Sequence, residues 1–166
     1  AKLISKTTLI FLFLVLGTSW VLELSQLPEA TTMKITFVNW NVVEISIPSK
    51  NIIKQTIDFG NKTTQFNNLL KFAIRRKFAS EENMCIEVFN GGEILSQTYL
   101  TRIIDNINAI LSLEEGMKIT RNDFFTFIGQ AKYRLRFLPE FIEINDALLL
   151  EFTSNIDNGH YKDFVK

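Results

Sequence analysis

The spacing of hydrophobic and polar residues changes twice along the chain. Residues 7–22 carry no charge, and residues 9–16 are almost all large and apolar on every side, which is typical of a helix surrounded by lipid. Residues 34–38 and 42–47 instead alternate, with an Asn-Trp-Asn turn between them, and this pattern predicts a β-hairpin. Further on, apolar residues recur mostly at three- and four-residue steps, which indicates amphipathic helices.

The uncharged N-terminal run is interpreted as a membrane anchor. As a helix it would be about 24 Å long, slightly short of the ~30 Å hydrocarbon core, and flanking side chains could extend it. Lys2 and Lys6 precede it and Glu23 follows it, so we expect the N-terminus on the matrix or cytoplasmic side. A signal peptide and a buried core helix are the alternatives. The residues expected to contact lipid are Leu9, Phe11, Phe13, Leu16 and Trp20.

Helices dominate the expected structure of the remaining chain. The apolar spacing predicts helices over 51–59, 64–78, 93–111, 120–135 and 142–156, with a short strand at 84–89. Short loops between helices favour antiparallel neighbours. The expected fold class is therefore mainly α: an N-terminal single transmembrane helix, a short β-hairpin, then an antiparallel helical-hairpin domain. The expected divisions are 1–27 for the anchor, 28–92 for the hairpin and linker helix, and 93–166 for the helical domain.

Composition excludes several classes of function. The chain has 18 basic and 18 acidic side chains, which excludes a broadly basic nucleic-acid binder. One His and one Cys exclude multi-ligand zinc sites and a disulfide framework. Cys85 is expected to be a packed thiol and His160 a surface residue. Nucleotide-binding and hydrolase motifs are absent from the sequence, so we expect no catalytic residue, cofactor or metal, and an enzyme with a dispersed site is the weaker alternative.

Residue usage points to an assembly partner. Phe, Ile, Asn and Lys, which have AT-rich codons, outweigh Gly, Ala, Arg and Pro, as in an organelle or a reduced bacterial genome. Fifteen Phe exceed what one small core needs and leave apolar area for neighbouring subunits. A basic run, residues 75–77, is either a solvated helix end or a contact for acidic groups. The expected partner contacts are Phe124, Phe125, Phe137, Phe141, Arg75, Arg76 and Lys77.

Two turns and the order of elements resemble a known family. Residues 158–164, Asn-Gly-His-Tyr-Lys-Asp-Phe, resemble the turn between the two helices of a tetratricopeptide (TPR) repeat, and residues 113–116 form a similar turn. With the apolar N-terminal segment, Trp20 and the Glu-x-Ser of residues 44–46, the chain resembles the HemY family. That resemblance implies an inner-membrane protein with TPR-like helices and a link to haem biosynthesis. The family's second membrane helix has no counterpart here, because residues 47–78 are too charged.

Two functional hypotheses follow. In the first, the protein is a non-catalytic, membrane-anchored accessory subunit of a large inner-membrane complex, such as a respiratory complex or ATP synthase. In the second, it is a membrane-tethered TPR-like adaptor resembling HemY. Both imply other subunits and the lipid bilayer as partners and no nucleic acid. Both also place the protein in a mitochondrial or bacterial inner membrane, with the C-terminal domain on the side opposite the N-terminus.

Overall fold

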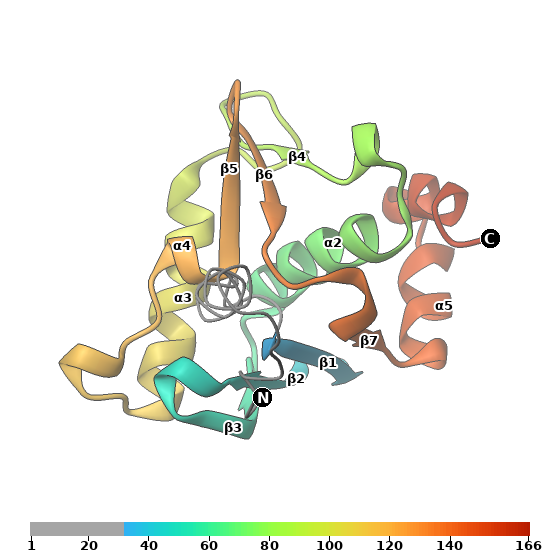
Figure 1. Cartoon of the computed structure of the whole chain (residues 1–166). Helices are drawn as coiled ribbons and strands as arrows, with labels where there is room; N and C mark the ends of the chain where they lie inside the picture. Colours follow the sequence, from blue (N-terminus) through green and yellow to red (C-terminus); the bar gives the residue numbers. More distant parts are fainter. Residues whose placement is uncertain (1–31) are drawn as a thin grey trace, which may run out of the picture. The chain divides into compact units, whose positions relative to one another are not determined.

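Two β-sheets and the helices that pack on them make up residues 32–166, the part of the chain that this computed structural model describes (Figure 1). The strands are β1 (Lys34–Asn39), β2 (Val42–Ile47), β3 (Ile52–Asp58), β4 (Ile86–Glu87), β5 (Phe125–Gly129), β6 (Lys132–Leu135) and β7 (Ile142–Ile144). The α-helices are α2 (Thr63–Phe78), α3 (Gln97–Leu111), α4 (Arg121–Phe124) and α5 (Asp146–Ser154). The 3-10 helices named below are η2 (Pro48–Lys50), η5 (Pro139–Phe141) and η6 (Ile156–Asp163).

The first sheet has the strand order β3-β2-β1-β7. The predicted hairpin is confirmed: β1 and β2 pair antiparallel with Ile35 opposite Ile45, and Asn41 takes the left-handed conformation that the tight turn requires. Because side chains alternate between the two faces of a strand, this register buries one apolar row. Strand β7 pairs parallel to β1, with Ile142 opposite Ile35, so the sheet is completed by residues more than a hundred positions away.

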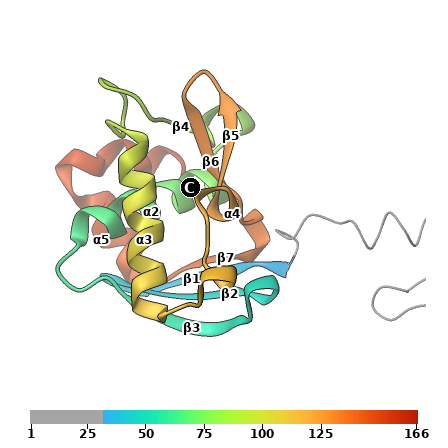
Figure 2. The ribbon, with the colours of Figure 1, turned by 90° about the vertical axis from the view of Figure 1, so that its left-hand side faces the viewer.

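The second sheet, ordered β4-β6-β5, is built around a tight hairpin. Strands β5 and β6 pair antiparallel, with Phe127 opposite Tyr133. Gly129, Gln130 and Ala131 all have positive φ at the turn, a conformation that only tight turns commonly require of residues other than glycine. The hairpin projects away from the first sheet in both views (Figures 1 and 2).

Helix α2 lies between the two sheets and contacts both. Its first half places Phe66 against Phe37 of β1 and against Phe59, with ring centroids 5.8 and 6.1 Å apart. Its second half places Phe72 against Phe125 of β5, 4.9 Å between centroids. Helix α3 lies beside α2 on the same side of the first sheet (Figure 2). One hydrophobic core therefore runs from the first sheet through α2 to the base of the hairpin.

Three expected helices are wrong in whole or in part. Residues 51–59 form strand β3, residues 120–135 form α4 followed by the β5–β6 hairpin, and residues 142–156 divide into β7 and α5. Strand β3 is held by the neighbouring β2, β5 and β6 hold each other, and β7 is held by the distant β1. In each case strand pairing outweighs local helical spacing. The helices predicted over 64–78 and 93–111 are present as α2 and α3, the latter starting at Gln97.

The TPR-like architecture is also wrong. The described residues form a mixed α/β domain with two sheets and not a stack of helical hairpins. The segment likened to a repeat turn, residues 158–164, lies largely within the 3-10 helix η6, whose Tyr161 is fully buried in the core.

The structure also corrects the expectation of a single-pass inner-membrane protein with its C-terminal helical domain on the opposite side. In residues 32–166, no helix has the length and apolar character needed to cross a bilayer. The expected anchor residues Leu9, Phe11, Phe13, Leu16 and Trp20 lie outside the described residues.

Truncation of Phe66 tests the role of α2. We expect Phe66→Ala to lower the free energy of unfolding by about 3–5 kcal/mol, because the ring is fully buried between α2 and the first sheet. Leu150→Ala on α5, where the side chain is 68% exposed, should change it by less than about 0.5 kcal/mol. Urea denaturation measures both, and equal losses would contradict a core centred on α2.

Candidate functional site

The basic end of α2 binds groups elsewhere in the fold. Arg75 donates to the Asn83 carbonyl at 2.9 Å and to the Glu93 carboxylate at 2.8 Å. Arg76 donates to the carbonyl of Phe137 at 3.0 Å, and Lys77 donates to that of Pro139 at 3.3 Å. The three cations therefore fasten two loops to the C-terminal end of α2, where the helix dipole also favours positive charge.

Glu93 is the centre of the most elaborate polar cluster in the described chain. Its carboxylate accepts hydrogen bonds from Arg75 and from the Tyr161 hydroxyl, and His160 Nε2 lies 3.7 Å from it. The Arg75 guanidinium also lies 5.4 Å from the centroid of the Tyr161 ring and 5.0 Å from that of Phe164, distances at which a cation is attracted to an aromatic ring. The cluster ties the C-terminal segment to α2.

Burial and the ion pair shift two pKa values in this cluster. Burial alone would lower the pKa of Arg75, but attraction to Glu93 and hydrogen bonding outweigh it and raise that pKa above its ordinary value. Burial, and then the neighbouring Glu93 carboxylate, raise the pKa of Tyr161 well above its ordinary value. The Tyr161 hydroxyl therefore stays protonated and donates to Glu93 across the neutral pH range.

A polar pocket of about 330 Å³ opens beside this cluster. It is lined by Arg75, Glu82, Asn83, Cys85, Glu87, Glu93 and Lys132. Arg75 and Glu93 form a salt bridge with each other. Glu87 and Lys132 lie opposite each other in the pairing of β4 with β6. Cys85, partly buried, is the thiol of the pocket, and no histidine lines it.

The phenylalanines expected to contact a partner lie mostly in the core. Phe124, Phe125 and Phe137 are at most 1% exposed. Phe124 packs edge-to-face on Phe137, with centroids 5.1 Å apart. Phe141 is half-buried in η5. These rings support the hairpin from below, and a partner meeting this folded surface would not touch the buried three.

The exposed apolar surface lies instead on the β5–β6 hairpin. Phe127 is 56% exposed and Ile128 is 48% exposed. The Val88 N–H donates to the Ala131 carbonyl at 2.8 Å, which brings the 45% exposed Phe89 to the same end of the sheet as the hairpin turn. We call Phe89, Phe127 and Ile128 the hairpin surface. The helical spacing of residues 120–135 hid it, although the alternation Phe-Thr-Phe before a Gly-Gln-Ala turn was a signal for a hairpin.

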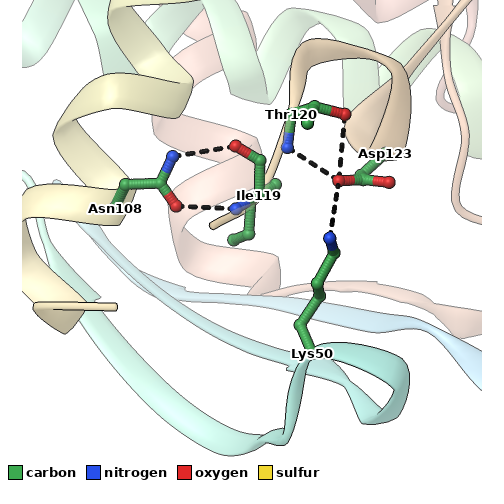
Figure 3. Close-up of polar contacts among 5 residues, drawn as sticks. All are labelled: Lys50, Asn108, Ile119, Thr120 and Asp123. Carbon is green, nitrogen blue, oxygen red and sulfur yellow. Dashed lines mark hydrogen bonds and ion pairs between the residues drawn. The ribbon is translucent and has the colours of Figure 1, made fainter. Parts of the chain in front are cut away.

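The base of the hairpin is held by a polar network that joins three parts of the chain (Figure 3). The Asn108 side chain of α3 both donates to the Ile119 carbonyl and accepts from its N–H, each at 2.8 Å. Asp123 accepts from the N–H and hydroxyl of Thr120 in a capping box, and Lys50 of η2 lies 3.8 Å from it. Since α4 continues directly into β5, this network fixes where the hairpin begins.

Among residues 32–166, no group of three or more His, Cys, Asp or Glu side chains is arranged to hold a metal ion. The chain matches no protein-family model, no curated protein and no solved structure. With neither a family match nor a helical-repeat fold, the resemblance to the HemY family is wrong, and the implied link to haem biosynthesis is withdrawn with it.

Asn108→Ala should loosen the base of the hairpin. We expect a loss of about 1–3 kcal/mol in unfolding free energy, because two backbone groups of Ile119 lose their partners. The Ile119 amide should also exchange with solvent faster than in the unmodified chain. Asn122→Ala, at an exposed position of α4, is the control and should change neither quantity appreciably. Denaturation and amide hydrogen exchange measure the two effects.

Tyr161 gives the domain an alkaline limit. A group whose pKa is raised by folding contributes stability that is complete below its unfolded pKa, about 10 for Tyr, and is lost as pH rises above it. The unfolding free energy should therefore fall as pH rises above about 10. Tyr161→Phe should lower stability at neutral pH but reduce this slope, by at most ~1.4 kcal/mol per pH unit. An unchanged slope in Tyr161→Phe would contradict the assignment.

Proposed function

We propose that this protein is a non-catalytic accessory subunit that attaches to a larger protein assembly through the hairpin surface. The observation that carries the proposal is the exposure of Phe127 and Ile128 on a hairpin that projects from the domain (Figure 1). Large apolar side chains gathered on one projecting element are typical of a protein contact, because burying them on association is favourable.

The support beneath the hairpin favours recognition. Phe125 packs on Phe72 directly below the exposed residues, and the Asn108 network fixes the approach to β5. A rigidly held surface loses little conformational entropy on binding, so more of the gain from burying Phe127 is available as affinity. A flexible loop with the same residues would bind more weakly.

The polar pocket beside Glu93 supports a non-catalytic role. Its central charges, Arg75 and Glu93, are neutralised by each other and by the Tyr161 hydroxyl, so neither is a free acid or base for a substrate. The residues with the strongest electrostatic coupling thus hold the C-terminal segment in place. The proposal therefore places binding on the exposed apolar residues of the hairpin and not on this pocket.

A paired variant tests the proposal. In cells that produce the full chain, Phe127→Ser with Ile128→Ser should lose co-migration with a larger complex on a native gel, because the contact loses its apolar area. Leu150→Ser on α5, which changes an even more exposed apolar residue, is the matched control and should co-migrate normally. Migration of the unmodified chain as a free protein, or loss of the complex in the control as well, would contradict the proposal.

A further inference from the structure

The outer edge of β5 carries backbone groups that have no partner in the described domain. The Arg136 N–H donates to the Phe124 carbonyl at 2.7 Å, which sets the phase of the antiparallel ladder. Residues two positions further along each strand, Thr126 and Arg134, form the next hydrogen-bonded pair. Phe127, one position later, therefore directs both its N–H and its carbonyl away from β6.

The opposite side of the hairpin confirms this phase. Tyr133 lies across from Phe127 in a pair without mutual hydrogen bonds, so its backbone groups must face β4. It does pair with Ile86 of β4, and the Val88 N–H donates to Ala131 on the same side. Strand β5 is thus the open edge of the second sheet, with Phe127 at its middle.

The other sheet edges are short or blocked, whereas the register irregularity of β5 comes only after Phe127, between Phe127 and Gly129. On β3, the Gln55 amide covers the Ile53 carbonyl at 3.0 Å, and Lys54 breaks the extended conformation with a φ of 51°. Strands β7 and β4 contain only 3 and 2 residues. Strand β5 reads Phe-Thr-Phe-Ile-Gly, with no charge and no proline. Proteins usually block exposed apolar edges because such edges pair with other strands.

We propose that a second copy of this chain pairs antiparallel with β5, with Phe127 at the two-fold axis. This proposal rests on the proposed role of the hairpin surface in binding and makes a second copy of this chain one component of the larger assembly. The edge is self-complementary, since Phe127 offers one donor and one acceptor to the same residue of the second copy. The pairing joins two three-stranded sheets into one of six strands.

Side chains and charge favour the same partner. The Phe127 ring lies 5.1 Å from the Tyr133 ring, so pairing about Phe127 extends an aromatic row across the dimer axis. The strand itself is uncharged and the chain has a formal net charge of zero. Pairing about Phe127 therefore places no like charges of β5 opposite each other.

The first experiment compares Phe127→Pro with Phe127→Leu by analytical ultracentrifugation. The unmodified 19.2 kDa chain should sediment as a concentration-dependent dimer. Proline removes the outward N–H but no bond to β6, so the monomer should still fold, as circular dichroism would show. Its dimer dissociation constant should rise at least about tenfold relative to Phe127→Leu, which lacks the ring but keeps the donor. A monomeric unmodified chain, or equal constants for the two variants, would overturn the pairing.

The second experiment tests the register. In a Cys85→Ser background, Phe127→Cys should form an intermolecular disulfide under mild oxidation, because paired residues at the axis have Cα atoms about 5.5 Å apart. Leu150→Cys in the same background is more exposed and should remain mostly monomeric. A dimer that fails to cross-link at position 127, or cross-links equally in both variants, is not joined through β5.

These results separate the inference from the proposed function. A monomeric chain whose larger complex is still lost in the Phe127→Ser, Ile128→Ser variant would leave the hairpin as a binding surface for another protein and overturn self-pairing alone. A monomeric chain whose larger complex survives that double substitution would overturn both.

Discussion

Burial of two phenylalanines on one helix holds the described domain together. Phe66 and Phe72 lie at opposite ends of the buried stripe of α2, one against the first sheet and the other against β5. Neither sheet is large: the second has three short strands, and a sheet of that size is stable only when it packs on something else. The helix supplies that surface for both. The position of the hairpin therefore depends on the packing of α2.

Polar contacts at the C-terminal end of α2 hold the loops that the apolar core does not position. The last turn of α2 carries three adjacent cations. Arg75 binds Glu93, and Arg76 and Lys77 bind carbonyls of residues 137 and 139. Because Arg75 and Glu93 are largely removed from water, their pairing compensates a desolvation cost that either charge alone would impose. This explains why residues 75–77 act inside the domain although a solvated helix end usually carries such a run.

Local pattern predicted those elements whose stability is mostly local. The hairpin at 34–47 and helices α2 and α3 follow directly from alternation and from helical spacing. The errors fall on strands β3, β5, β6 and β7, whose conformation is decided by pairing with another strand. Only β7 has a partner distant in sequence, β1. In residues 120–135 the same apolar residues fit either period, and the Gly-Gln-Ala turn decides for a hairpin. The exposed surface was missed for the same reason: a helix and a strand put different residues of this segment on the buried face.

The same geometry explains why Phe127 is exposed while Phe125 is buried. Both point to the same face of β5, but Phe125 lies at the strand's beginning, over Phe72, whereas Phe127 has moved beyond the end of that support. Where a hairpin extends past the helix that supports it, its side chains have no surface to pack on and are exposed. On β3 of the first sheet such positions are occupied by polar residues, a lysine and a glutamine. Strand β5 instead has phenylalanine and isoleucine at its exposed positions 127 and 128. Covering this surface with another molecule lowers the free energy. Because the backbone edge beside it is open, another strand can bury the side chains and also pair with the free backbone groups.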